Sequence, residues 1–296
     1  MLTEVFYVAR LIAAFILLYL VVIFLPFMVC AAARHDSDNE LQVHFIDVGQ
    51  GDSILIEAPN GRNMLVDGGP PSAAEKVIGY LRERNVKKLD LVVATHPDID
   101  HIGGMVEVLS EFEVKHLVDS GKLYTTETYF HYLQQIKKQK IPVTIAAGEE
   151  NIVIDPQLTI RVLNTQNAFK TNNQSSIALS IRYGRVDFLL MADVETIQEQ
   201  HILDAKHLEA EILKVAHHGS GTSTSFDFIR EVRPETAILS YSKANDFGHP
   251  VDRVVDYLQL AGATIYSTAK AGDIVIRTDG KTYDVDVSGT DRVLTY

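Results

Sequence analysis

The stretch THPDIDHIGG, from Thr95 to Gly104, decides how this sequence is interpreted. It directly follows an apolar run, Leu89–Ala94, that is typical of a buried strand, so it falls on the loop at the strand's carboxyl end, where open α/β proteins keep their chemistry. Unpaired carboxylates packed so closely would repel one another, whereas a divalent cation reverses that penalty. The stretch therefore predicts a metal site rather than a solvated acidic loop, with the candidate ligands His96, Asp98, Asp100 and His101.

Hydrophobic patterning places this loop in a series of alternating strands and helices. The dipeptide Asn60–Gly61 between two apolar runs predicts a β-hairpin. Strands are predicted at Leu41–Val48, Ser53–Glu57, Asn63–Val66, Leu89–Ala94, Val114–Val118, Leu158–Leu163, Ser176–Tyr183, Val186–Met191, Ile212–Ala216, Thr236–Ser240, Thr264–Tyr266 and Asp273–Arg277. Helices are predicted at Ala73–Arg84, Met105–Ser110, Thr128–Lys140, Val194–Asp204, Ser225–Val232 and Val251–Ala261. Two hairpin-rich halves, each followed by helices, indicate an α/β fold with two packed sheets and helices outside.

Other polar residues follow predicted strands. Asp67 comes after the first hairpin, Asp193 after the second, and His217 and His218 after the strand Ile212–Ala216. Such strand ends converge in space although they are far apart in sequence, so two sheets that present them at one edge would supply enough ligands for two metal ions. Asp193 is the natural bridge because a carboxylate offers one oxygen to each ion.

The amino terminus predicts a membrane-directed segment. Residues Leu11–Ala33 form 23 uncharged positions between Arg10 and Arg34, enough to cross a bilayer at about 1.5 Å per residue. The run is longer than a signal-peptide core of roughly 7–15 residues, which favours a retained anchor, yet three alanines at its end suit cleavage. Residues 1–34 are thus a signal peptide or a single transmembrane anchor, and a buried soluble helix is the alternative. Residues 35–40 read as a polar linker, and residues 41–296 as one extracytoplasmic domain, anchored or secreted.

Composition limits the partners of that domain. The single cysteine, Cys30, lies in the apolar segment, so the domain forms no disulfide of its own. The net charge of −12 does not attract nucleic acid at long range, and a polyanionic substrate must be held locally, by metal ions and a few basic residues. The stretch Gly49–Ser53 lacks the lysine and the spacing of a phosphate-binding loop and predicts a tight turn.

Several motifs, in a fixed order over residues 41–278, resemble the metallo-β-lactamase-fold domain of the ComEC competence proteins. They are IDVGQGDSILIE, LVDGG, THPDIDHIGG, NNQSS, FLLMADVE, LKVAHHGS and FGHP. The resemblance implies a four-layer αββα sandwich and a binuclear metal hydrolase. It does not extend to the DNA channel of that family, which needs many membrane spans.

The resemblance also implies roles for individual residues. His96 and Asp98 would hold one ion, Asp100 and His101 the other, and Asp193 would bridge them, with His218 completing the second site. Asp100 and His217 are the candidate catalytic residues; if the segment is extended, His217 points away from His218, as a general acid or in a structural hydrogen bond. The supporting or substrate-proximal candidates are Asp67, Asn173, Ser220 and His249. Ala192 stands where the family commonly has Gly.

The implied chemistry is phosphodiester hydrolysis, with DNA as the expected substrate. Because Asp98 and Asn173 stand where the broader superfamily has histidines, the first site should tolerate manganese or magnesium better than a three-histidine site would, and the expected cofactor is two divalent ions, zinc or manganese, with magnesium also possible. The alternatives are a cell-surface esterase that acts on a phosphorylated wall polymer, phosphocholine or a lactone, and a non-enzymatic metal-bound domain that tethers DNA. The absence of Trp and of repeats argues against a choline-binding esterase, and the net charge of −12 argues against a DNA tether.

Overall fold

The first sheet carries the predicted metal loop. In the computed structural model, which describes residues 39–148, 150–164, 170–205 and 208–289, it has eight strands in the order β17-β16-β1-β2-β3-β5-β7-β8. Their bounds are β1 Leu41–Phe45, β2 Ile54–Glu57, β3 Asn63–Val66, β5 Leu91–Ala94, β7 Leu117–Asp119, β8 Val143–Ile145, β16 Ile274–Thr278 and β17 Tyr283–Val287. Strands β1, β2 and β3 are antiparallel, and β3, β5, β7 and β8 run parallel. The parallel part therefore delivers successive carboxyl ends to one edge.

The second sheet has seven strands in the order β15-β14-β13-β12-β11-β10-β9. Their bounds are β9 Asn151–Ile152, β10 Leu158–Val162, β11 Leu179–Tyr183, β12 Val186–Leu190, β13 Ile212–Lys214, β14 Thr236–Leu239 and β15 Thr264–Ser267. Strands β11 and β12 form the predicted second hairpin, and β12 to β15 run parallel. A separate pair of short strands, β4 Lys88–Leu89 and β6 Glu113–Val114, is also parallel.

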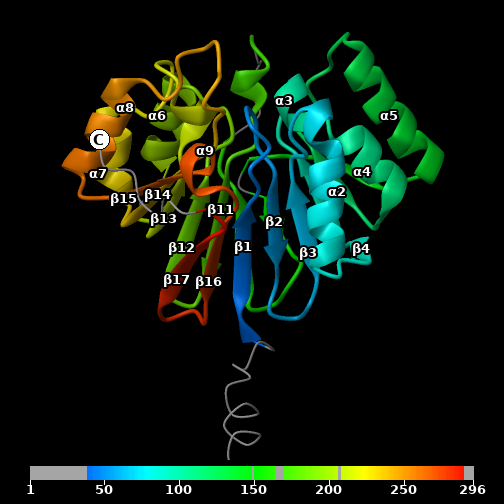
Figure 1. Cartoon of the computed structure of the whole chain (residues 1–296), viewed down its shortest axis with the longest axis horizontal. Coiled ribbons are helices and arrows are strands. Elements are labelled where there is room, and N and C mark those ends of the chain that lie inside the picture. The colour runs from blue at the N-terminus through cyan, green and yellow to red at the C-terminus, as the bar shows by residue number, and fades with distance from the viewer. Residues whose placement is uncertain (1–38, 149, 165–169, 206–207, 290–296) are drawn as a thin grey trace, which may run out of the picture. The chain divides into compact units, whose positions relative to one another are not determined.

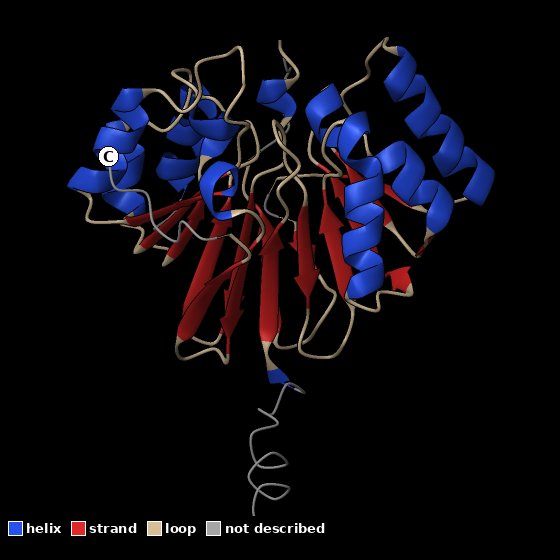
Figure 2. Ribbon diagram, in the orientation of Figure 1, coloured by secondary structure: helices blue, strands red, loops and turns tan. Residues whose placement is uncertain are grey.

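Side-chain alternation along the strands builds three apolar cores. Phe45 and Ile56 of the first sheet share a core with Phe188 of the second, so the two sheets pack face to face. On the opposite face of the first sheet, Leu55 packs with the helices α2 Ala74–Glu83, α4 Met105–Glu111 and α5 Glu127–Gln139. On the outer face of the second sheet, Leu189 packs with the helices α7 Phe226–Val232 and α8 Asp252–Leu260. Helix α6 Thr196–Ala205 lies near this third core. The layers follow the expected αββα order, with the helices on the two flanks (Figures 1 and 2).

The structure corrects several predicted boundaries. The predicted strand Leu89–Ala94 breaks at Asp90, whose carboxylate accepts a hydrogen bond from the Asn63 backbone N–H. The strand Ile212–Ala216 ends at Lys214, because a turn at Ala216–Gly219 follows. Strands β8, β9 and β17 were not predicted; in β17, the sequence YDVDV alternates charged and apolar residues along a half-exposed edge.

The predicted segment 11–33 lies outside the described residues, so neither the anchor nor the signal peptide is observed. Within the described ranges, no helix combines the length and apolarity that a membrane span requires.

Candidate metal centre

The loop after β5 is held in place by backbone and side-chain contacts. Thr95 donates two hydrogen bonds to the Asp67 carboxylate, from its backbone N–H (2.9 Å) and its hydroxyl (2.6 Å). After the loop, residues Ile99–Ile102 form the short helix α3. Gly51 packs against this segment so closely that a Cβ there would lie 2.1 Å from the carbonyl oxygen of Asp100. The metal loop is therefore braced from both sides.

Three imidazole rings are oriented through their Nδ1 atoms. His101 Nδ1 lies 2.8 Å from an oxygen of Asp67, and His218 Nδ1 lies 2.8 Å from the carbonyl oxygen of Ser240. His96 Nδ1 lies 3.0 Å from the Thr95 hydroxyl, which donates its own proton to Asp67 and so accepts from the ring. Each Nδ1 therefore carries the proton, and each Nε2 offers a lone pair, as metal-ligating histidines do.

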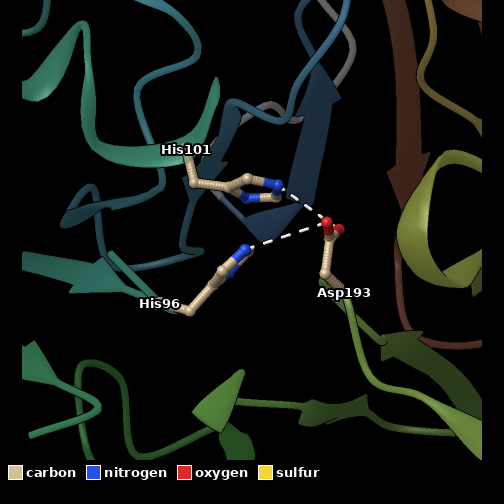
Figure 3. A group of neighbouring side chains, drawn as sticks. All are labelled: His96, His101 and Asp193. Carbon is tan, nitrogen blue, oxygen red and sulfur yellow. Dashed lines mark ion pairs between the residues drawn. The ribbon is translucent and has the colours of Figure 1, made fainter. Parts of the chain in front are cut away.

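These Nε2 atoms converge on Asp193, which follows β12. Its Oδ1 lies 3.3 Å from His101 Nε2 and 3.6 Å from His218 Nε2. Its Oδ2 lies 3.8 Å from His96 Nε2 and 3.6 Å from His217 Nε2. Figure 3 shows the rings of His96 and His101 pointing from one side at the carboxylate of Asp193. The two oxygens of one carboxylate thus face two different sets of donors.

The residues present fit divalent cations. Four donor atoms of the centre are buried and have no hydrogen-bond partner among the described residues: the Nε2 atoms of His96, His101 and His218 and the Oδ1 atom of Asp193. Buried polar atoms left unpaired are costly, so four in one place indicate a shared partner. Two atoms bound to one tetrahedral ion at about 2.1 Å lie about 3.4 Å apart, which is close to the spacings around Asp193. Imidazole nitrogens with carboxylate oxygens are ligands for zinc, manganese and iron alike.

The two aspartates of the metal loop occupy different environments. Asp100 Oδ2 lies 3.4 Å from His218 Nε2, and Asp100, His101 and His218 form a group whose donor atoms lie within 4.8 Å of one another. Asp98 Oδ2 lies 3.5 Å from His96 Nε2, its side chain is 30% exposed, and Asn172 donates a 2.5 Å hydrogen bond to its Oδ1. The Asp100 side chain is similarly exposed, at 27%, so the two aspartates differ in the histidine that each faces rather than in exposure.

The centre concentrates negative charge. Burial by itself would raise the pKa of Asp193, but His101 and His218 bring that pKa well below its ordinary value. Burial also opposes ionisation of Asp100, yet His218 and His101 beside it lower its pKa to about 2. Burial lowers the pKa of His101, but Asp193 and Asp67 raise it well above its ordinary value. The ionised carboxylates therefore favour a second proton on His101 in the absence of metal, and divalent cations would replace that proton on binding.

His217 lies closer to the centre than the sequence interpretation allowed. Residues Ala216–Gly219 form a turn, with φ of 48° at His217 and 56° at His218, so the premise of an extended segment is wrong. In this left-handed turn both rings reach Asp193, whereas alternation along a strand would have separated them. His217 Nδ1 lies 3.0 Å from the Thr222 hydroxyl. Burial lowers the pKa of His217, although Asp193 opposes the shift.

The remaining predicted residues surround the centre at different depths. Asn173 Nδ2 lies 3.4 Å from His217 Nε2. Ser220 directs its hydroxyl to Thr222 and stabilises the turn rather than facing Asp193. The His249 ring stacks over that of His218, with centroids 6.4 Å apart, and meets His217 edge-on at 5.6 Å.

A buried ion pair behind the centre was missed in the sequence. Lys214, at the end of β13, has a fully buried side chain that contacts Asp52 Oδ2 at 2.9 Å and the Val215 carbonyl at 3.0 Å. The other oxygen of Asp52 lies 3.7 Å from His218 Nδ1. Burial would raise the pKa of Asp52, but Lys214 lowers it below its ordinary value. The signal was available, because a lysine inside the apolar run LKVA needs a buried partner.

Ala192, the residue before Asp193, adopts φ of 46°. This left-handed conformation costs a residue with a Cβ about 1–2 kcal/mol and is free for glycine. A glycine at this position would therefore relieve strain beside the central carboxylate.

Comparison with known proteins places the chain in a family. Residues 46–243 match the family model described as the metallo-β-lactamase superfamily. The chain is 31% identical over 258 residues to ComE operon protein 3 of Bacillus subtilis (strain 168), with 81% of this chain and 33% of that protein covered. It is 27% identical over 244 residues to competence protein ComA of Neisseria gonorrhoeae, with 79% of this chain and 32% of that protein covered. The chain thus spans about a third of the length of these curated relatives, and the resemblance to competence proteins is confirmed.

The comparison of structures agrees on the fold. The metallo-β-lactamase fold protein YhfI from Bacillus subtilis superposes with a TM-score of 0.55 at 16% sequence identity, over 81% of this chain and 100% of that chain. At this identity the likeness shows the fold alone.

Proposed function

Because the chain belongs to the metallo-β-lactamase superfamily, we propose that it is a binuclear metal-dependent phosphodiesterase that cuts DNA. The observation that carries this proposal is the position of Asp193, whose Oδ1 faces His101 and whose Oδ2 faces His96. A carboxylate between two donor sets suits two cations about 3.5–4 Å apart, the arrangement used for displacement at phosphorus. The competence relatives support DNA as the substrate.

The donors divide between two ions according to the oxygen of Asp193 that they face. One ion would be held by Oδ2 with His96 and Asp98, and the other by Oδ1 with Asp100, His101 and His218. When bound, the two cations would supply an acidified water and neutralise charge on the phosphate. With Asp98 supplying oxygen to the first site, manganese and magnesium would be tolerated there better than at a site of three histidines.

His217 is the residue proposed to return a proton to the leaving oxygen. Its Nε2 lies 3.6 Å from Asp193 Oδ2, at the edge of the donor cluster, and the Thr222 hydroxyl fixes the ring through Nδ1. Because burial lowers the pKa of His217, its protonated ring is a stronger acid than a free imidazolium. Asp67 acts through His101 and keeps the ring in one tautomer.

The central test replaces the bridging carboxylate. The full chain, stripped of metal and resupplied with manganese or zinc, is given single-stranded DNA, duplex DNA and bis-p-nitrophenyl phosphate. We expect Asp193→Ala to lower metal-dependent cleavage by at least about a thousandfold, because both ions lose their shared ligand. Asp256→Ala, which removes an exposed aspartate of α8, is the matched control and should behave as the unmodified chain.

The outcomes of this test separate fold from substrate. Unchanged cleavage by Asp193→Ala would contradict the proposed mechanism. Two metals bound per chain without cleavage of DNA would leave the metal centre standing and move the search to wall polymers, phosphocholine esters and lactones.

The proposal extends to location. The uncharged segment 11–33 supports an extracytoplasmic domain, held by an anchor of residues 1–34 or released after their cleavage, with residues 35–40 as the linker. Mass analysis of the mature amino terminus distinguishes the two forms. An intact terminus on a chain that fractionates with the cytoplasm would contradict both.

A further inference from the structure

An exposed aromatic residue stands beside the metal centre. The loop between β14 and α8 carries Phe247, whose side chain is 68% exposed. Phe247 stacks on His249, with ring centroids 5.6 Å apart and an interplanar angle of 24°. His249 in turn stacks on His218, at 6.4 Å and 28°. Three rings therefore lead from a candidate metal ligand to the solvent.

The loop that presents Phe247 is fastened from within. The Asn245 side chain donates to the carbonyl oxygens of Ser242 and His249 and accepts from the His249 backbone N–H. Beyond the loop, the Val251 backbone N–H donates to the Gly219 carbonyl, which ties it to the turn of the metal centre. The aromatic face is thus held outward at a fixed distance from the centre instead of packing into a core.

We propose that Phe247, backed by His249, is a stacking site for an unpaired nucleobase of the nucleotide next to the bond that is cut. This inference rests on the proposed function. Every base has a π face, so aromatic stacking holds nucleic acid without reading its sequence. Stacking also needs no positive charge, which suits a chain of net charge −12 whose exposed Lys243 is offset by Asp246 in the same loop.

The site has a consequence for the strand that is cut. A base on Phe247 must leave the stack of its own strand, which costs least where the base is already unpaired. Single strands and frayed ends are therefore the favoured substrates, and the middle of a duplex is disfavoured.

The experiment compares two strands and three variants of the full chain in its metal-loaded form. One strand is an oligothymidylate, and the other is identical except for a central block of base-free sugar phosphates. KM and kcat are measured separately for cleavage within the block and at the matching thymidines. The variants are Phe247→Ala, Phe247→Leu, which keeps an apolar side chain without a π face, and Phe130→Ala, which removes another exposed phenylalanine (58%) from α5.

We expect the unmodified chain to have a KM at least about fivefold lower for the thymidine strand than for the base-free block, since one stacked base contributes that much or more. This ratio should collapse toward one in Phe247→Ala and fall in Phe247→Leu, with kcat little changed, and it should persist in Phe130→Ala. A ratio unaltered in Phe247→Ala, or fully retained by Phe247→Leu, overturns the stacking site while the nuclease proposal stands. No cleavage of either strand by the unmodified chain overturns both.

Discussion

The two oxygens of Asp193 face surroundings of different firmness. On the Oδ1 side, His101 and His218 are fully buried, and each ring is locked through Nδ1, one by a carboxylate and the other by a backbone carbonyl. The ion pair of Asp52 and Lys214 lies directly behind this side. Both imidazoles of this side are therefore oriented before an ion arrives, whereas Asp100 remains partly exposed, at 27%.

On the Oδ2 side, the ring of His96 is buried but is held only by a neighbouring hydroxyl. Asp98 is 30% exposed and depends on Asn172 for its position. A single carboxylate can therefore connect a metal site whose imidazoles are held in place with a second site whose ligands are held less firmly. We therefore expect two unequal metal affinities, with the tighter site on the Oδ1 side.

The largest effect is expected from removing the buried lysine behind the Oδ1 side. Lys214→Met leaves the carboxylate of Asp52 buried without its lysine, so we expect a loss of about 3–5 kcal/mol in the free energy of unfolding. Urea denaturation of the metal-free protein measures it. The double variant Asp52→Asn with Lys214→Met should recover much of the loss, because it removes the buried charge.

A surface ion pair provides the control for this variant. Lys88 contacts Asp90 at 3.0 Å with 47% of its side chain exposed, so Lys88→Met should cost at most about 1 kcal/mol. Equal losses from the two lysine variants would show that the buried ion pair contributes no more to the free energy of unfolding than the surface pair does.

The next effect concerns the carboxylate that orients the tighter site. Asp67→Asn keeps the size and the left-handed backbone of Asp67 but removes its charge and replaces one of its two acceptor oxygens, which serve Thr95 and His101, with a donor. We expect the affinity of the tighter site for manganese to fall about 10- to 100-fold, measured by calorimetric titration of metal-free protein. Asp155→Asn, another buried aspartate away from the centre, should leave both affinities unchanged; a common loss in both variants would indicate a general loss of folding.

A smaller effect is expected on the adaptable side. Asn172→Ala removes the amide that donates to Asp98, and because that carboxylate is partly exposed, water replaces the amide in part. The affinity of the weaker site should fall about three- to tenfold, with the tighter site unchanged, in the same titration. If the tighter site weakens instead, the assignment of the two sides is reversed.

The smallest expected effect is a gain in stability rather than a loss. Ala192→Gly relieves the positive φ beside Asp193, and we expect the protein to gain about 1 kcal/mol of stability. Thermal unfolding should shift upward by about 2–4 °C for a domain of this size. A lower unfolding temperature would mean that the methyl group of Ala192 packs more favourably than its backbone is strained.

Local patterns in the sequence predicted much of the framework. The strand at Asn63–Val66 has its predicted bounds, because an Asn–Gly turn and apolar alternation are both short-range signals. The loop Thr95–Gly104 was predicted at a strand end for the same reason, since its polar residues are contiguous with a buried run. Short strands with mixed burial, such as Val143–Ile145, carry no such signal and were not predicted.

What the sequence by itself determined was therefore the set of polar side chains delivered to strand ends, together with the alternation that packs the sheets. The tertiary structure alone decided which of them meet: the two faces of Asp193, the left-handed turn that brings in His217, the pairing of Asp52 with Lys214 and the stacking of Phe247 on His249. The physical reason is range. Burial periodicity acts over a few residues, whereas a buried charge or an unpaired nitrogen finds its partner only after two sheets far apart in the chain have packed together.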